Sequence, residues 1–468
     1  MTEPRLILGR YGPWWRKRPF ALTGSDISVH KHVMGLTGQG KSKFLASLFV
    51  QLVSQGIACA LVDPHSDLAD DVLGLLARQG HFNGSLIHPT LLHVDFSRRD
   101  RFLPFNILKS PYADHDVAMH VVEVCKRVWP SLAGGAAPMF ENVMLASALT
   151  LIQNGLPITE VPRLITDKRY RDMLLANVTD PQVVHFFRAS FDNLRPVDQL
   201  DQAQSSLRRV FLLTFSQTLR YSLGQTANAL DFRALMDGGV SAIYDLGGLD
   251  EETQKFLGAI VTVGYEVAAL SRADIPLPMR RPHHLILDEF SMFSATSEEA
   301  LARILSLARK YALTLTMAHQ TWSQVSSRLQ GALQNTTSVA FKLGRSDAEW
   351  VNRQMLRVDP RSLSHREDSD TEGVGMNEQR EAFIQELTEL KPRYAYVKAP
   401  GKGPWPHHKP ITRIQKVKTL PVPSTAELAE VVHRVKEEYA ARLLTRRGEV
   451  EDLLPGLDTE PEPPPRWG

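Results

Sequence analysis

Short runs of apolar, often β-branched residues recur along the chain and predict seven β-strands. Several runs are continuous rather than alternating, as expected for strands that helices cover on both faces. The segment Lys41–Val53 carries apolar residues at helical spacing directly after the first run. The pattern predicts an α/β fold with a mostly parallel central sheet. The predicted strands are Val29–Met34, Ile57–Val62, Leu91–Phe96, Ser241–Leu246, Leu285–Asp288, Leu313–Ala318 and Ser338–Leu343.

Between Ile107 and Asp231 the pattern changes to helical segments broken by Pro and Gly, without a comparable strand. We therefore expect a helical domain at 107–230, inserted into a sheet domain formed by residues 29–106 and 231–400. An N-terminal segment (1–28) and an extension (401–468) flank them. Further expected elements are a helix at Asp347–Leu356, a polar loop at His365–Glu381, a β segment at Tyr394–Lys398, a charged helix at Ser424–Arg447 and a Pro-rich tail.

Composition limits the function classes. The 468 residues are 43% hydrophobic and 23% charged, as in an ordinary folded chain with two or three cores. A formal net charge of +2 excludes a globally basic nucleic-acid-binding protein, so any DNA contact must come from local basic patches. Cys59 and Cys125 have neither metal-binding nor disulfide spacing, and we expect both to be reduced core residues of a cytoplasmic protein.

The N-terminus lacks the apolar region of a signal peptide. The longest apolar stretches, Phe44–Val53 and Phe256–Leu270, are shorter than the ~18 to 20 residues that span a bilayer, so no transmembrane segment is expected. Trp14 and Trp15 precede the basic run Arg16–Arg18. This segment could contact a membrane surface or DNA, but a packed, capped N-terminal segment is the more common case.

Residues 35–42 read GLTGQGKS, a complete G-x-x-x-x-G-K-[ST] phosphate loop between a predicted strand and a predicted helix. Its glycines allow a tight turn in which successive N–H groups and the helix N-terminus point at a phosphate chain. Lysine reaches the β- and γ-phosphates, and serine offers its hydroxyl to Mg²⁺. The predicted cofactors are therefore ATP and Mg²⁺, and the predicted nucleotide-binding residues are Gly35, Thr37, Gly38, Gln39, Gly40, Lys41 and Ser42.

A second part of the site is predicted where the strand LILDEF ends in two carboxylates. At the carboxyl edge of an open α/β sheet, Asp288 would hold Mg²⁺ and Glu289 would polarise the attacking water. The alternative is a solvated acidic turn. Gln320 follows the next strand and could bond the γ-phosphate or the water, whereas His319 could equally be a buried structural imidazole.

This motif set resembles the HerA/FtsK superfamily of hexameric DNA-pumping ATPases, and most closely the cytoplasmic ATPase part of TraG/TraD-type conjugative coupling proteins. The resemblance rests on the phosphate loop, LILDEF, LVDPHSDLADDVL at 61–73, ARKYALTLTMAHQ at 308–320 and LQNTTSVAFKLGRSDAEWV at 333–351. It covers roughly residues 29–351 and implies a RecA-like P-loop domain with an all-α insertion. Coupling proteins usually begin with two transmembrane helices, which this sequence does not show.

The resemblance also implies roles for single residues. Lys41 and Ser42 would bind nucleotide and Mg²⁺, Asp288 and Glu289 metal and water, and Gln320 would be the sensor. Arg309, eleven positions before Gln320, matches the place of an arginine finger that acts on the neighbouring subunit, with Arg345 as the second candidate. A solvated helix face is the alternative for Arg309.

The implied function is an ATP-driven DNA translocase, working as a homohexameric ring in conjugative transfer or type IV secretion. Two alternatives stay open: a HerA-like translocase acting with a nuclease in repair or defence, and an ATPase that handles secreted protein. A relaxase, a secretion channel or a nuclease is the expected partner, through which the chain could sit at the inner membrane. Candidate DNA contacts are the 365–381 loop, with His365, Arg366 and Arg380, and the run 163–171, with Lys168, Arg169 and Arg171.

Overall fold

The computed structural model describes residues 3–128, 137–356, 376–402 and 410–453. These residues divide into two compact units. The first consists of residues 1–92, 233–245 and 264–435, and the second of residues 93–232, 246–263 and 436–468, as far as they are described. The predicted 365–375 part of the polar loop and the Pro-rich tail lie outside the described residues.

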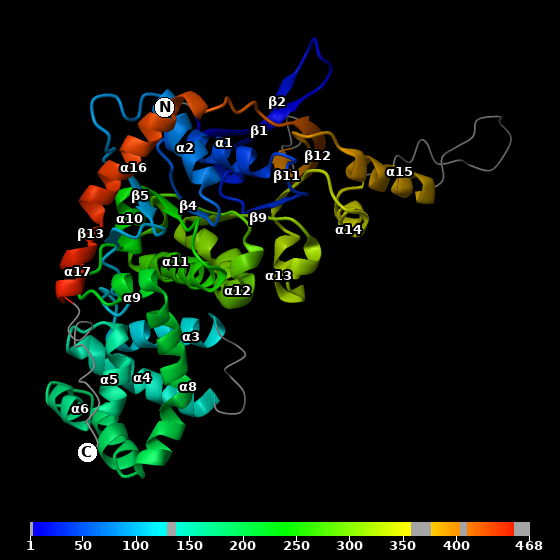
Figure 1. Ribbon diagram of the computed structural model, residues 1–468. Helices are drawn as coiled ribbons and strands as arrows, with labels where there is room; N and C mark the ends of the chain where they lie inside the picture. Colours follow the sequence, from blue (N-terminus) through cyan, green and yellow to red (C-terminus); the bar gives the residue numbers. More distant parts are fainter. Residues whose placement is uncertain (1–2, 129–136, 357–375, 403–409, 454–468) are drawn as a thin grey trace, which may run out of the picture. The chain divides into compact units, whose positions relative to one another are not determined.

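One large sheet organises the first unit (Figure 1). Its eleven strands lie in the order β2-β1-β12-β11-β10-β3-β9-β8-β4-β7-β5. The six strands from β10 to β7 pair in parallel, and β11, β12, β1 and β2 continue the sheet in antiparallel pairs. The strands are β1 (Arg5–Tyr11), β2 (Arg18–Thr23), β3 (Lys31–Met34), β4 (Ala58–Asp63), β5 (Leu91–Asp95), β7 (Ser241–Asp245), β8 (His283–Leu287), β9 (Leu313–His319), β10 (Thr337–Ala340), β11 (Tyr394–Lys402) and β12 (Pro410–Lys418).

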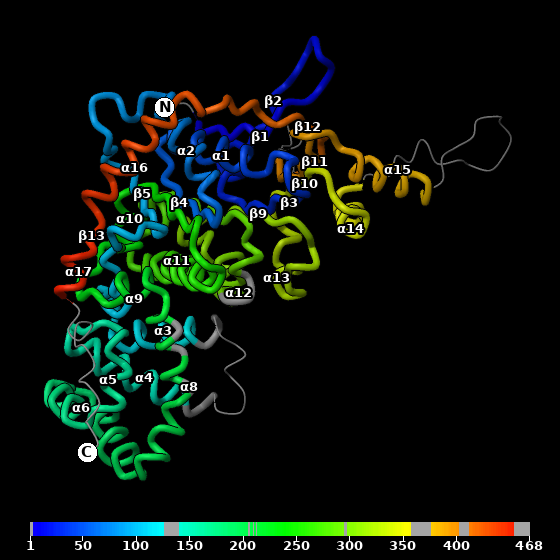
Figure 2. Tube along the Cα trace, in the orientation of Figure 1, coloured from blue at the N-terminus to red at the C-terminus, as the bar shows by residue number. Residues whose placement is uncertain are grey.

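The helices of this unit lie on both faces of the sheet for a topological reason. From β3 through α1 (Lys41–Ser54) to β4 the chain moves one way across the sheet, whereas from β8 through α12 (Ser291–Leu307) to β9 and through α13 (Ser327–Leu333) to β10 it moves back. Right-handed crossovers in opposite directions put their helices on opposite faces. Figures 1 and 2 show α1 and α2 (Asp67–Arg78) on one face and α12 and α13 on the other.

All seven predicted strands are present, with ends that coincide or differ by at most three residues. The α/β class and the mostly parallel sheet are therefore confirmed. The pattern did not predict β1, β2 or β12, which extend the sheet from the N-terminal segment and from beyond residue 400. β8 begins two residues earlier than predicted because His283 and His284 are buried strand residues.

The described part of the 107–230 segment is helical and belongs to the second unit. Helix α4 packs against α3, α5 and α8 there, and the buried rings of Phe187 and Phe191 contact each other edge to face. The helices are α3 (Asp114–Val128), α4 (Ala137–Gln153), α5 (Val161–Thr166), α6 (Lys168–Leu175), α7 (Pro181–His185), α8 (Pro196–Phe215) and α9 (Gln217–Leu223).

The remaining elements complete the two units. In the second unit, β6 (Arg101–Phe102) pairs with β13 (Thr445–Arg446) beside α17 (Arg447–Leu453). Four more helices are α10 (Phe232–Gly238), α14 (Arg345–Met355), α15 (Met376–Glu389) and α16 (Ala429–Leu443). The predicted charged helix at 424–447 thus ends at Leu443, before the short strand β13.

One helix of the described chain is long and apolar enough to cross a membrane, in the stretch Glu251–Asp274 that contains α11 (Glu251–Ser271). Two thirds of its most apolar window (67%) is buried within the fold. A buried core helix passes the same test of length and composition, so the helix alone does not indicate a membrane span.

Candidate nucleotide site

The phosphate loop lies between β3 and α1, as predicted. Gly38 and Gly40 have φ values of +75° and +102°, a region that side-chain-bearing residues rarely adopt. Gly40 is also the N-cap of α1, so the first N–H groups of that helix face the loop. The loop therefore has the tight turn and the adjoining helix N-terminus that suit the binding of a phosphate chain.

Lys41 points back into this turn. Its Nζ donates to the carbonyl oxygens of Gly35 (2.7 Å) and Leu36 (3.4 Å), and it lies 3.9 Å from Glu289 Oε1. The side chain is buried, and burial lowers the pKa of the ammonium, while Glu289 and Asp288 act in the opposite direction. A poorly hydrated cation held among carbonyl groups is well prepared to exchange them for phosphate oxygens.

Ser42 and Asp288 meet across the sheet edge. Ser42 Oγ donates to Asp288 Oδ2 at 3.3 Å, although the two residues are 246 positions apart in the chain. Asp288 is 3% exposed, and burial, with the charge of Glu289, raises the pKa of its carboxyl group. A hydroxyl and a carboxylate are hard oxygen donors of the kind that Mg²⁺ prefers.

Glu289 is held in a strained backbone conformation. Its φ of +43° costs on the order of 1–3 kcal/mol for a residue with a side chain. The turn is fixed on both sides, because Asp288 N donates to Val62 O on β4 and Phe290 N donates to Ala318 O on β9. The strain places the Glu289 carboxylate beside Lys41, where Gln320 Nε2 donates to its Oε1 at 3.0 Å.

Gln320 reaches this position because β9 lies between β3 and β8 in the sheet. The three parallel strands end at one edge, so the residues that follow them come together: the phosphate loop after β3, Gln320 after β9, and the carboxylate pair after β8. Gly35 N donates to His319 O at 3.4 Å, which joins the loop directly to the residue before Gln320.

His319 is buried and belongs to a histidine pair. Its Nε2 lies 2.5 Å from His32 Nε2, the two rings stack at 4.8 Å, and its Nδ1 contacts Thr321 O at 2.8 Å. Burial lowers the pKa of His319 to about 4. The His319 ring thus connects the segment that carries Gln320 to β3, the strand that leads into the phosphate loop.

A third carboxylate of the same edge serves the structure. Asp63, at the end of β4, accepts from the backbone N–H groups of His65 (2.9 Å) and Ala69 (2.8 Å) and so holds the turn into α2. Burial raises the pKa of its carboxyl group to about 6. Neighbouring Asp245 accepts from Ser66 Oγ at 2.5 Å. Among the described residues, no group of three or more His, Cys, Asp and Glu side chains has the geometry of a metal site.

The two arginine-finger candidates lie at opposite edges of the sheet. Arg309 lies in a 3-10 turn (Ala308–Tyr311), not in an α-helix, directly before β9 begins, and its side chain is exposed. It therefore lies at the amino edge, away from the phosphate loop of its own chain. Arg345 opens α14 near the carboxyl edge, and it pairs with Glu381 (2.9 Å) and Glu349 (3.4 Å).

Arg393 was not singled out from the sequence, yet it lies against the phosphate loop. Its backbone N–H donates to Gln39 O at 3.0 Å, and its own φ is +69°. A Cβ at Gly40 would lie 3.6 Å from the Arg393 side chain. The turn before β11 thus supports the loop from the antiparallel side of the sheet. Only the chain fold brings positions 39 and 393 together, so no local pattern could have revealed this.

The candidate DNA contacts differ in their availability. Arg171 is 1% exposed, pairs with Asp192 at 2.5 Å and donates to Leu164 O and Ile165 O. It is a structural residue, so its interpretation as a phosphate contact was wrong. Lys168, Arg169 and Arg380 are exposed, and His365 and Arg366 lie outside the described residues.

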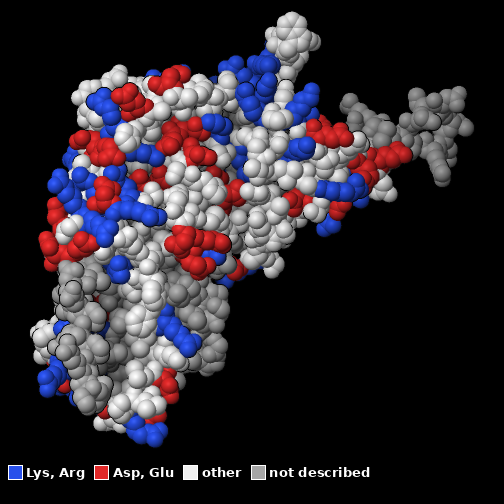
Figure 3. All heavy atoms as spheres, viewed as in Figure 1, with Lys and Arg blue, Asp and Glu red and all other residues white. Residues whose placement is uncertain are grey.

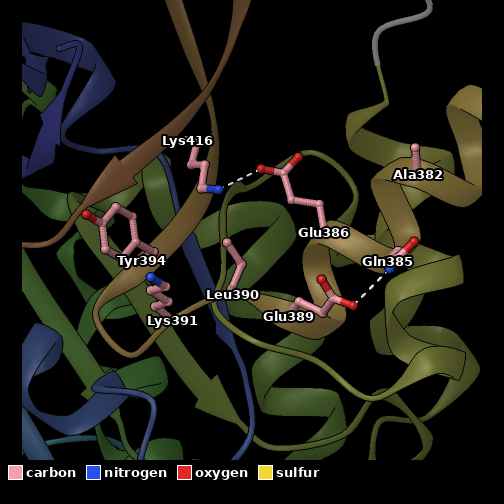
Figure 4. A pocket seen from close by; sticks show the side chains of 8 residues that line it. All are labelled: Ala382, Gln385, Glu386, Glu389, Leu390, Lys391, Tyr394 and Lys416. Atoms are coloured by element: carbon pink, nitrogen blue, oxygen red, sulfur yellow. Dashed lines mark hydrogen bonds and ion pairs between the residues drawn. The ribbon is translucent and has the colours of Figure 1, made fainter.

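A groove lies between α15 and the β11–β12 hairpin (Figure 4). Glu386 stands at its centre. Its carboxylate accepts from Lys416 Nζ and from the Tyr396 hydroxyl, both at 2.6 Å. The groove thus contains the Glu386–Lys416 bond, which is one of the contacts between α15 and the sheet.

No family model matches this sequence, and no curated protein matches it. Known structures do match. The unbound bacterial conjugative coupling protein TrwB aligns over 86% of this chain and 87% of its own, with a TM-score of 0.54 and 17% identity. The chain has the fold of this coupling protein. The predicted likeness to coupling proteins is thereby confirmed at the level of the fold.

Two further known structures match the fold of this chain. TrwB in complex with ADP and Mg²⁺ aligns over 84% of this chain and 85% of its own (TM-score 0.52, 18% identity). VirB4 of Thermoanaerobacter pseudethanolicus aligns over 90% of this chain and 98% of its own (TM-score 0.51, 13% identity).

Proposed function

We propose that this chain is an ATP-hydrolysing motor that forms a ring and moves DNA, of the type that serves conjugative transfer and type IV secretion. One observation supports it most strongly. Five polar side chains that follow three neighbouring strands meet at one sheet edge, and they are the set that nucleotide hydrolysis needs: Lys41, Ser42, Asp288, Glu289 and Gln320. The likeness to nucleotide-bound TrwB points the same way.

The residues fit ATP with Mg²⁺. A Cβ at Gly38 would meet no atom within 4 Å, so the loop is open above its turn. Ser42 and Asp288 contribute two oxygen donors, and the lack of a larger carboxylate cluster in the described chain fits a Mg²⁺ that takes its other ligands from phosphate and water. When bound, Mg²⁺ supplies charge neutralisation at the transferring phosphate.

In this proposal, each side chain has a separate role in hydrolysis. Lys41 binds the β- and γ-phosphates after leaving the carbonyl oxygens of Gly35 and Leu36. Glu289 orients the attacking water and accepts its proton on a carboxylate that the strained turn aims at the loop. Gln320, bonded to Glu289 Oε1, registers whether the γ-phosphate is present and passes this to the segment after β9.

Arg309 is the proposed finger for the neighbouring subunit. Its guanidinium makes no ion pair with any residue of the described chain, whereas Arg345 already pairs with two glutamates. A finger supplied in trans contributes ~10³ to 10⁵ in rate. Arg309→Ala should therefore bind ATP but not hydrolyse it, and mixing it with Lys41→Ala subunits should restore turnover. Two inactive variants that stay inactive when mixed would contradict the assignment.

In this proposal six subunits form the ring, the motor works on the cytoplasmic side, and a relaxase, a secretion channel or a nuclease delivers or receives the DNA. The test is the steady-state ATPase rate with single-stranded DNA, with double-stranded DNA and without polymer, at low and moderate salt, with Lys41→Ala as the inactive control. Stimulation by one DNA form would support the proposal. A rate unaffected by DNA but raised by an unfolded polypeptide would favour a protein-handling ATPase.

A further inference from the structure

The tip of the β1–β2 hairpin exposes two tryptophans. The strands pair as far as Tyr11 and Arg18, and the six residues between them form the loop. Trp14 is 82% exposed and Trp15 is 71% exposed, and their rings contact each other edge to face at 5.6 Å. The packed N-terminal segment that the sequence favoured is therefore wrong for these side chains. Two large exposed aromatic rings on one loop indicate an interaction surface.

The hairpin presents this tip from a firm base. Tyr11 and Phe20 pack edge to face at 6.3 Å, and the Arg413 guanidinium lies 4.7 Å from the centre of the Phe20 ring. Gly9 approaches β12 so closely that a Cβ there would lie 2.8 Å from Lys418 O. The loop is thus the end of a sheet extension, not part of a free N-terminal strand.

The charge around the tip has one sign. Arg10, Arg16, Lys17 and Arg18 are exposed, and none of them forms an ion pair within the described chain. The sequence contains no Asp or Glu from Pro4 to Ser25. In Figure 3 the projecting tip is uncharged, with a cluster of basic side chains directly behind it. The order from the apex inward is therefore aromatic, then cationic.

We propose that this hairpin tip docks on the surface of an anionic lipid bilayer. Tryptophan partitions into the interface between headgroups and acyl chains, and cations behind it meet the lipid phosphates. Single-stranded DNA fits less well, because stacking on bases needs ring faces along a cationic track, and here the two rings stand at 89° to each other in front of the cations. This inference is independent of the proposed motor function.

The test is flotation of the full chain with vesicles of pure phosphatidylcholine and with vesicles that also contain phosphatidylglycerol. We expect binding to the anionic vesicles only. A cation near such a surface contributes about five-fold in partitioning, so Arg16→Gln with Arg18→Gln should weaken binding about 25-fold. Trp14→Ala with Trp15→Ala should weaken it by at least about ten-fold, since it removes the inserted apolar area.

Phe215→Ala is the matched control, since Phe215 is an equally exposed aromatic residue (81%) at the end of α8. It should leave vesicle binding unchanged, and all variants should keep the thermal unfolding midpoint of the wild type. Equal binding of the Trp14→Ala/Trp15→Ala variant and the wild type would overturn the proposal. If the Trp14→Ala/Trp15→Ala variant loses affinity for a single-stranded oligonucleotide but keeps its vesicle binding, the proposal is overturned in favour of a DNA contact.

Discussion

Glu289 combines a strained backbone with a carboxylate aimed at the phosphate loop. Hydrogen bonds from the residues on either side of Glu289 to β4 and β9 maintain its φ of +43°. Strained backbone of this kind is typical of functional positions. Glu289→Gln keeps the size of the side chain and an acceptor for Gln320, but it cannot take a proton from water.

We expect Glu289→Gln to lower kcat by about 10²- to 10⁴-fold while ATP stays bound, because general-base catalysis contributes about this much. Single-turnover hydrolysis and equilibrium nucleotide binding measure the two effects separately. Glu299→Gln, on the following helix α12, should hydrolyse ATP normally. A Glu289→Gln variant with the wild-type rate would show that another group takes the proton.

His32 is predicted to be a positioning residue for the sensor. It is fully buried on β3, and its contact with His319 Nε2 fixes the segment that carries Gln320. His32→Phe should therefore lower kcat and leave KM for ATP nearly unchanged. His284→Phe is the matched control, because His284 is an equally buried strand histidine (1% exposed) on β8. Equal ATPase rates in the two variants would mean that the histidine pair is only a packing feature.

At the scale of elements, the Glu386 carboxylate adds two hydrogen bonds between α15 and the sheet. Charge-assisted bonds to Lys416 and Tyr396 hold the pKa of Glu386 below its usual value, although burial alone would raise it. Because the pair with Lys416 is about 40% exposed, solvent screening weakens it. We expect Glu386→Ala to cost about 1–2 kcal/mol and to speed amide hydrogen exchange in α15.

Glu389→Ala is the control on the same helix, since Glu389 is exposed and accepts only from Gln385 in Figure 4. It should change neither the unfolding free energy nor the exchange rates. If both variants behave alike, the Glu386 contacts do not secure the helix.

The elements that sequence predicted and those that it missed differ in their burial. The parallel strands are covered on both faces, so each is a continuous apolar run that stands out. β12 reads PITRIQKVK, in which Arg413, Lys416 and Lys418 interrupt the apolar residues on both faces of the strand. Its partner β1 lies about 400 positions away in the chain (Arg10 pairs with Lys418). Pairing over such a distance leaves no local signal. The two halves of the candidate site were predictable because each is a compact motif at a strand end. The support that Arg393 gives to the phosphate loop was not predictable, because the two segments are far apart in the sequence.

At the scale of the whole molecule, five buried histidines set the response to acid. Burial lowers the pKa of His30 and His319 to about 4 and of His283 to about 3, and it holds the pKa values of His32 and His284 well below 6.5. Below about pH 6.5 the unfolded chain takes up protons that the folded chain does not. Stability must then fall as the pH falls.

Buried carboxyl groups oppose this effect. Asp63, with a pKa of about 6, takes up its proton at a higher pH in the folded chain than in the unfolded chain. The raised pKa values of Asp288 and Asp347 act in the same direction. Five histidines outweigh three carboxyls, and each net proton lowers stability by about 1.4 kcal/mol per pH unit. The urea midpoint should fall steeply from pH 6.5 to pH 4. His283→Phe should flatten this slope, whereas His65→Gln, at an exposed position, should not. A midpoint that is constant or rises toward pH 4 would contradict the prediction.

Movement along DNA distinguishes a motor from a DNA-dependent switch most directly. The measurement is the displacement of streptavidin from one end of a biotinylated DNA by the wild type and by Glu289→Gln, with ATP and with a non-hydrolysable analogue. The wild type should clear streptavidin only while ATP is hydrolysed, and Glu289→Gln should bind the DNA without clearing it. Hydrolysis stimulated by DNA but without any displacement would contradict translocation and leave a DNA-dependent switch.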